Sequence, residues 1–478
     1  MFDVKMREAG VLLHPTSLPH GVLGVDAYRF VDFLAEAGFS LWQVLPLGPT
    51  HGDRSPYQAK SVHAGNPDLI AWPYAAARHW LTDEQAVGER QRCKYFAVQG
   101  FLRHAQADER QAYDSFCHQQ QSWLEDYCLY SALKQHFEGA SWVDWPDALR
   151  CREPAALQQW SAQLATDVEA FRLEQFLFFT QWLGLREYAH KRQVRLFGDM
   201  PIFVAHDSSD VWANQEIFLL DEAGQPTVVA GVPPDYFSET GQRWGNPLYD
   251  WPALQKQKFA WWCDRMATQL QLFDLIRIDH FRGFEAYWEI DAAEETAING
   301  QWKLGPGGAF FEALQQRFGD RLPLVAEDLG VITEQVDALR EAFELPGMKI
   351  LQFAFGGGAD NPYLPHNHAQ NSVVYTGTHD NNTTLGWWLE QSQGVREHVQ
   401  SYLGCRVEDM PWPMIRSALA SRSRWCVLPL QDLLGLDATH RMNVPGTEEG
   451  NWGWRLDWGQ FSPTLAARCR QLLTLYGR

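Results

Sequence analysis

The chain has no long hydrophobic run and no paired cysteine motif. No stretch reaches the roughly 18 apolar residues that a membrane span requires, which argues against a membrane protein. The start, MFDVKMRE, contains no apolar signal segment, so we expect an unexported, cytoplasmic protein. The eight cysteines are scattered and never form a Cys-x-x-Cys pair, which disfavours a zinc site or a disulfide framework and fits a reducing compartment.

Positive charge is also scarce. The 40 lysines and arginines are outnumbered by 59 aspartates and glutamates, which gives a net charge of −19. Such a surface repels phosphate backbones, and no basic patch overrides the repulsion. We therefore expect no nucleic-acid partner, whereas the sequence leaves the oligomeric state open.

Aromatic residues, by contrast, are abundant. The 22 tryptophans and the aromatic share of 13% exceed what a core of this size needs. Flat, amphipathic rings suit the apolar faces of sugar rings, while carboxylates nearby take the hydroxyls. Many of these rings are therefore expected in a groove, although a single Trp in a helical segment can equally be a packing residue.

Eight short apolar runs alternate with segments of helical periodicity. This alternation favours a parallel sheet, and closure into a (β/α)8 TIM barrel is the simplest arrangement of eight such strands. The predicted strands are 9–14, 41–47, 194–204, 275–281, 324–329, 348–353, 372–378 and 426–430.

Two intervals are too long for ordinary crossovers. The segment at about 66–190 has helical periodicity and predicts a helical insertion after the second strand. The segment at about 205–270 predicts a loop-rich insertion after the third strand, and its glycines and prolines at 228–249 argue against regular structure there. No linker marks a boundary, so we expect one catalytic barrel domain over 1–478.

Three of the predicted strands carry a carboxylate near or just beyond their carboxyl end: Asp279, Glu327 and Asp380. Roughly 50 residues separate each from the next, which leaves room for a helix and its loops, and barrel strands deliver their ends to one rim. One such carboxylate is as readily part of a structural salt bridge, but three together favour a catalytic ring.

Strand alternation assigns roles within that ring. Arg277 and Asp279 point to the same side, while the isoleucines beside them face the helices. A guanidinium keeps Asp279 ionised and suited to nucleophilic attack, and Glu327 on the next strand can carry the proton. The charge of Asp380 is expected to help keep Glu327 protonated and to bind substrate hydroxyls.

Eight motifs in chain order make the sequence similar to the 4-α-glucanotransferases called amylomaltases or disproportionating enzymes, glycoside hydrolase family 77 of the α-amylase clan. Each motif alone is weak, but the set spans nearly the whole chain. The motifs are HPTSLP at 14–19, WQVLPLGP at 42–49, SPYQ at 55–58, GDMPI at 198–202, RIDHFRG at 277–283, AEDLG at 326–330, THDNNT at 378–383 and RMNVPGT at 441–447.

The resemblance implies roles for the carboxylates that agree with the strand pattern. Asp279 matches the nucleophile of the family, Glu327 its general acid/base, and Asp380 the third carboxylate, which steadies the distorted sugar. Arg277 and His379 match residues that contact the nucleophile and the hydroxyls of the sugar at the cleavage point.

The resemblance to the family extends to three further residues, for which it implies less definite roles. Asp199 corresponds to the aspartate of the first clan motif, and it either contacts sugar or only supports the arginine on the neighbouring strand. Tyr57 resembles a tyrosine that packs a sugar ring. Asn443 is the weakest match, because Met-Asn-Val-Pro is equally a turn signal.

Tyr236, Phe237 and Trp244 lie in a segment that resembles the family's loop over the acceptor side. Aromatics that hold a sugar acceptor and exclude water favour transfer over hydrolysis. The alternative is a hydrophobic plug that ties the insertion to the barrel.

The implied reaction moves a segment of an α-1,4-glucan, such as a maltooligosaccharide, to the 4-hydroxyl of glucose or of another glucan. It is a retaining double displacement through a covalent glycosyl-enzyme, for which the two working carboxyls lie about 5–5.5 Å apart. The residues imply no cofactor and no metal. The chain lacks the long N-terminal extension of some relatives and resembles the short bacterial form.

Three alternatives remain open at this point. A hydrolase of the same clan would share the carboxylates and differ in its products. A metal-dependent barrel hydrolase would use His14, His280 and His379, but no predicted strand offers His-x-His. A non-catalytic glucan-binding protein would be expected to lack one of the carboxylates, and all three are present.

Overall fold

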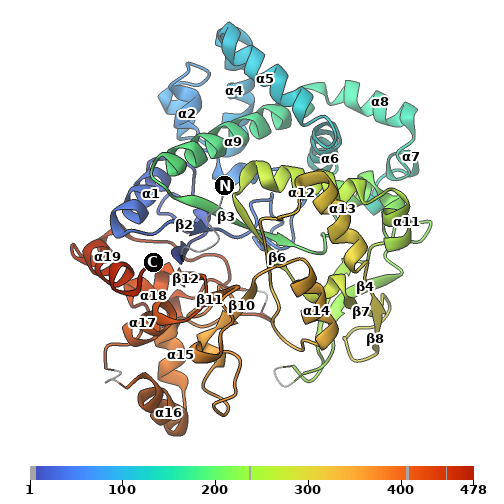
Figure 1. The fold of residues 1–478 in the computed structure, drawn as a ribbon. Coiled ribbons are helices and arrows are strands. Elements are labelled where there is room, and N and C mark those ends of the chain that lie inside the picture. Colours follow the sequence, from blue (N-terminus) through green and yellow to red (C-terminus); the bar gives the residue numbers. More distant parts are fainter. Residues whose placement is uncertain (1–6, 236–237, 405–407, 448) are drawn as a thin grey trace.

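Eight parallel strands form a nearly closed barrel at the centre of the molecule (Figure 1). The computed structural model describes residues 7–235, 238–404, 408–447 and 449–478. The strand order is β10-β11-β12-β1-β2-β3-β6-β9, and the amide of Ala326 donates to the carbonyl of Pro346 (2.9 Å) where the two ends of the sheet meet. The strands are Glu8–Leu12 (β1), Leu41–Gln43 (β2), Arg195–Pro201 (β3), Leu275–Asp279 (β6), Leu324–Ala326 (β9), Gly347–Ile350 (β10), Ser372–Tyr375 (β11) and Trp425–Pro429 (β12).

This architecture confirms the predicted (β/α)8 barrel, and each barrel strand overlaps one of the eight predicted runs. Side-chain alternation along the barrel strands divides the core of the barrel into two clusters. Leu275 belongs to the cluster inside the barrel, together with Phe197 and Val325 from the adjacent strands. Ile276 and Ile278 belong to the larger cluster between the strands and the helices. Arg277 and Asp279 therefore share the inner side of β6, as expected.

Helices surround the barrel (Figure 1). The last of them packs against the first, which brings the two ends of the described chain to one side of the molecule. These helices are Val25–Ala37 (α1), Ala165–Lys191 (α9), Ala260–Leu272 (α12), Gly308–Phe318 (α13), Glu334–Ala342 (α14), Thr384–Glu390 (α15), Gln393–Leu403 (α16), Trp412–Ala420 (α17), Leu430–Leu434 (α18) and Leu465–Tyr476 (α19).

The segment between β2 and β3 is helical, and its longer helices pack on α9. In the part of the chain that the structure describes, no helix combines the length and the apolar character needed to cross a membrane. The helices before α9 are Pro73–Ala76 (α2), Asp83–Ala86 (α3), Arg90–His104 (α4), Ala107–Gln119 (α5), Leu124–His136 (α6), Asp147–Arg150 (α7) and Pro154–Gln163 (α8).

A second, antiparallel sheet stands beside the barrel, and the expectation of irregular structure at 228–249 is wrong. Its strands, in the order β5-β4-β7-β8, are Val228–Val232 (β4), Gln242–Pro247 (β5), Ala286–Asp291 (β7) and Gly300–Leu304 (β8). The short helices Ser209–Ala213 (α10) and Trp251–Lys256 (α11) flank β4 and β5 in the chain.

The glycines and prolines of that segment shape the sheet and do not prevent it. Gly231 lies at a register shift between β4 and β5, and a Cβ there would come within 2.3 Å of the carbonyl oxygen of Gln242. A glycine thus allows the close approach of the two strands. Pro233 and Pro234 follow the end of β4, where their missing N–H groups cost no ladder hydrogen bond.

Candidate active site

The three strand-end carboxylates meet in one cleft at the carboxyl ends of the barrel strands. Asp279 ends β6, Glu327 follows β9 and Asp380 lies in the loop after β11, and all three line a cleft of about 570 Å³. Tyr57, Trp244, Arg277 and Asn443 line the same cleft. The structure therefore brings together most of the site residues predicted from the sequence.

Arg277 connects two carboxylates from neighbouring strands. Its Nη2 donates to Oδ1 of Asp279 over 2.7 Å, and its Nη1 donates to Oδ2 of Asp199 on β3 over 2.5 Å. Burial alone would lower the pKa of Arg277, but the charges of Asp199 and Asp279 raise it, so the guanidinium stays charged. The side chain of Asp199 is fully buried, so its contacts are with other groups of the protein.

Tyr57 belongs to this network. Its hydroxyl donates to Oδ2 of Asp199 over 2.7 Å, and burial raises its pKa, so the phenol keeps its proton. The Tyr57 ring stacks on the imidazole of His379, with centroids 5.2 Å apart and an angle of 13° between the planes. Tyr57 thus joins the β3–β6 side of the cleft to the loop after β11.

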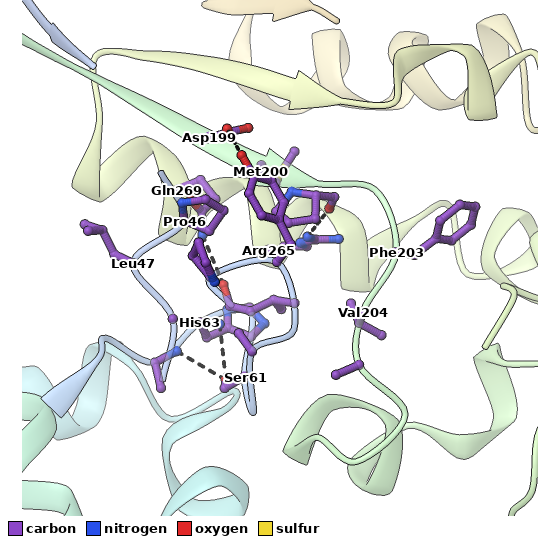
Figure 2. Close-up of a pocket in the computed structure, with 18 of the residues that line it drawn as sticks. Pro46, Leu47, Ser61, His63, Asp199, Met200, Phe203, Val204, Arg265 and Gln269 are labelled. Carbon is purple, nitrogen blue, oxygen red and sulfur yellow. Dashed lines mark hydrogen bonds between the residues drawn. The ribbon is translucent and has the colours of Figure 1, made fainter. Parts of the chain in front are cut away.

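A buried arginine supports β3 from behind (Figure 2). Arg265, on α12, donates from Nη1 to the carbonyl of Ile202 over 3.1 Å and from Nη2 to the carbonyl of Pro201. Its guanidinium also packs against the Trp262 ring, 4.6 Å from the centroid. Arg265 and Asp199 line the same small cavity of about 40 Å³. The end of β3 that carries Asp199 is therefore fixed by α12.

Glu327 is held by two backbone amides. The N–H of His280 donates to Oε2 over 2.8 Å and that of Leu329 to Oε1 over 3.2 Å. Burial raises the pKa of Glu327 to about 8, the negative charge of Asp279 adds to the rise, and Arg277 opposes it. Glu327 is therefore protonated at neutral pH, as expected. The sequence analysis expected the charge of Asp380 to help keep Glu327 protonated, but Asp380 is not among the leading causes of the raised pKa.

Asp380 is held in its ionised form by its neighbours. Its carboxylate lies 3.3 Å from Nε2 of His379 and accepts a hydrogen bond from Nδ2 of Asn443 over 2.7 Å. Seclusion in the cleft acts to raise the pKa of Asp380, but His379, Asn443 and Arg277 together lower it below its usual range. Arg441 donates to the Asp380 carbonyl over 2.9 Å. The motif at 441–447 is thus a support for the third carboxylate.

One predicted acceptor-side residue lies in the cleft and two lie outside the described residues. Trp244, on β5, meets the His280 ring edge-on at 4.9 Å between centroids. Because His280 follows Asp279 and its N–H holds Glu327, Trp244 lies close to both of these carboxyls. Tyr236 and Phe237 are outside the described residues.

The cleft is also lined by residues to which the sequence analysis gave no role in glucan binding or transfer, among them His280, Arg282 and Trp302. Burial lowers the pKa of His280 to about 4, so its ring is neutral. The RIDHFRG motif contains the first two, and it was the signal that could have indicated them. Among the described residues, no group of three or more His, Cys, Asp and Glu side chains is placed to hold a metal ion.

Fold and site together define a class of enzyme. A (β/α)8 barrel whose rim carries an arginine-paired carboxylate beside a protonated carboxyl has the groups that double displacement at a glycosidic bond requires. The 4-alpha-glucanotransferase family matches residues 12–460, which is nearly the whole chain. The chain belongs to this family and is a glucan-transferring enzyme.

Individual relatives agree with that assignment. The chain is 47% identical to the 4-alpha-glucanotransferase of Synechocystis sp. over 99% of this chain and 98% of the relative. It is 48% identical to that of Thermus thermophilus, with 98% of each chain covered. Among solved structures, the amylomaltase from Streptococcus agalactiae in complex with acarbose superposes with a TM-score of 0.94 at 35% identity, covering 99% of both chains.

Proposed function

We propose that this enzyme moves a segment of an α-1,4-glucan to the 4-hydroxyl of glucose or of another glucan. The observation that carries the proposal is the unequal environment of two neighbouring carboxyls. Asp279 is paired with Arg277, whereas Glu327 is kept protonated by burial and by the charge of Asp279. Such a pair separates the nucleophile from the acid, as retaining glycoside chemistry requires.

In the first step, the Asp279 carboxylate attacks the anomeric carbon of the donor while Glu327 gives its proton to the glycosidic oxygen. The bond to the leaving glucan breaks, and an ester to Asp279 forms. In the second step, Glu327 takes the proton from the 4-hydroxyl of the acceptor, whose oxygen displaces Asp279. The double displacement retains the configuration, and a separation of about 5–5.5 Å between the two carboxyls is expected.

The other residues take positioning and binding roles in this proposal. Asp380, His379 and Tyr57 bind the sugar at the cleavage point, and the hydrogen bond from Asn443 supports that role of Asp380. Arg277 orients Asp279. Full burial of Asp199 and its bonds to Arg277 and Tyr57 favour a supporting role over sugar contact.

Trp244 is proposed to pack the acceptor sugar beside the two carboxyls, together with Tyr236 and Phe237. Because an apolar wall there favours a sugar hydroxyl over water, it supports transfer over hydrolysis. Substrates are maltooligosaccharides and longer α-glucans, and the steps use side chains alone. The free thiols at every cysteine in the described residues fit a cytoplasmic setting.

The test is the product profile from maltotriose, separated by chain length. The proposal predicts chains longer than the substrate together with glucose, whereas a hydrolase of the same clan yields only shorter products. Asp279→Asn and Glu327→Gln are each expected to reduce transfer by at least about a thousandfold, because each removes an essential group. Glu334→Gln, at an exposed position on α14, is the matched control and is expected to retain activity. Undiminished transfer by either active-site variant would contradict the mechanism.

A further inference from the structure

Trp302 is exposed in the wall of the cleft, and none of the roles above uses it. It lies on β8, the edge strand of the second sheet, and lines the same cleft as Asp279 and Glu327. Its exposed fraction is 40%, which is high for a large apolar side chain in a concave site. Exposed aromatic surface in such a place is typical of a ligand contact.

The indole of Trp302 is held in one orientation by two neighbours. The Arg282 guanidinium lies over one face, 3.7 Å from the ring centroid, and Trp288 on β7 meets the ring at 67° with centroids 5.2 Å apart. Arg282 is only 7% exposed and donates from Nη1 to the carbonyl of Val331. Because a fixed cation covers one face, the other face is the one available to the cleft.

Connections to the reacting groups place Trp302 on the acceptor side. The general acid stands beside the glycosidic oxygen, on the side of the leaving group and of the acceptor. Trp244 contacts His280, whose amide holds Glu327, so Trp244 is the nearer aromatic on that side. Trp302 contacts Arg282, which binds the segment following Glu327 at Val331, so it lies further out along the same wall.

We propose that Trp302 is a stacking platform for a distal glucose unit of the acceptor chain and that it sets the preference of the enzyme for longer acceptors. The inference rests on the proposed function. The apolar C–H face of an α-1,4-linked glucose packs on the free face of the indole, and the rigid backing by Arg282 reduces the entropy lost on binding. A single glucose acceptor binds beside the carboxyls and does not reach the platform.

The experiment measures transfer from a saturating α-glucan donor to glucose, maltose, maltotriose and maltotetraose, each labelled at its reducing end. For each enzyme, the readout is kcat/KM for every acceptor, and the ratio of the longest acceptor to glucose reports the platform. The variants are Trp302→Ala and Trp302→Phe, which keeps a ring. Leu304→Ala is the matched control, on the same strand, 80% exposed and outside the described lining of the cleft.

Trp302→Ala is expected to lower the ratio of maltotetraose to glucose about three- to tenfold, with Trp302→Phe recovering most of it and Leu304→Ala leaving it at the wild-type value. The shortest acceptor for which Trp302→Ala lowers kcat/KM shows which glucose unit of the acceptor chain contacts Trp302. An unchanged ratio in Trp302→Ala overturns the proposal, as does an equal loss for glucose and the longer acceptors, which indicates a structural role. Failure of the proposed function is distinguishable, because the wild-type enzyme would then not lengthen any labelled acceptor.

Discussion

Among single residues, Glu327 has the environment that most directly controls the chemistry. Its carboxyl is partly buried beside the negative charge of Asp279, and its pKa is raised to about 8. The proton that Glu327 donates in the first step of the proposed mechanism is therefore present at neutral pH and is lost as the pH rises through that value. The two carboxyls interact, so the titration belongs to the pair.

This predicts an alkaline limb in the pH dependence of kcat/KM for maltotriose disproportionation. Activity is expected to fall about tenfold per pH unit once the pH is well above about 8, because only the protonated form of Glu327 can act as the acid. The measurement is the initial rate at low substrate between pH 5 and pH 10 in buffers of constant ionic strength. A limb with its midpoint near the ordinary glutamate pKa would contradict the assigned environment.

At this scale, the sequence predicts what alternation and local motifs determine. It places Arg277 and Asp279 on one side of β6, and the ion pair between them follows. It does not predict that Asp199 is fully buried or that the amide of His280 holds Glu327, because those contacts come from strands and turns distant in sequence. The cause of the raised pKa was missed for the same reason.

Among the secondary-structure elements, α12 has an influence on the site that no motif indicated. Arg265 binds the carbonyls of Pro201 and Ile202 at the end of β3, a few residues beyond Asp199. A buried guanidinium with these partners has the character of a structural clamp. Because Asp199 holds Arg277, which in turn holds Asp279, loss of the clamp affects both folding and catalysis.

Arg265→Met is expected to lower the free energy of unfolding by about 2–5 kcal/mol, since it leaves buried carbonyls and the Tyr249 hydroxyl short of a partner. It is also expected to lower kcat at 25 °C, where the variant is folded, with partial recovery in Arg265→Lys. Thermal unfolding and kcat are measured against Arg317→Met, an exposed position on α13. Lowered stability with full kcat would show that the clamp serves folding alone.

The elements of the barrel were predictable, and those of the second sheet were not. Barrel strands are buried on both faces, so most of them appear as apolar runs such as Trp425–Pro429. β8 is largely exposed and β5 is only partly buried, and both contain polar residues and glycine, so neither resembles a strand in sequence. Trp302 could not be assigned to the cleft without knowing that β8 exists.

At the scale of the whole molecule, α19 closes the outer layer of helices against α1. Leu472 and Leu473 are buried, and a Cβ added to Gly38, the residue that caps α1, would lie 3.5 Å from the Cδ1 atom of Leu473. Leu475, on the same helix, is 62% exposed. The helix is remote from the cleft, so its packing bears on stability and not on the reaction.

The double change Leu472→Ala and Leu473→Ala is expected to cost about 4–8 kcal/mol, because each removes a fully packed leucine. The midpoint of thermal unfolding is expected to fall by about 5–15 °C, with the specific activity at 20 °C retained in the folded fraction. Leu475→Ala is the control and should unfold within about 2 °C of the wild type. A double variant as stable as the control would show that α19 contributes little to the fold.

The second sheet is interleaved with the barrel: β4 and β5 precede β6 in the chain, and β7 and β8 follow it. The polypeptide thus passes through β6, which ends at Asp279, on its way from one half of this sheet to the other. No exchange of one continuous chain segment can replace the whole sheet without also replacing β6. If Trp302 sets the acceptor preference as proposed, that preference can be altered by point substitution or by exchange of the β7–β8 hairpin, which leaves β6 in place.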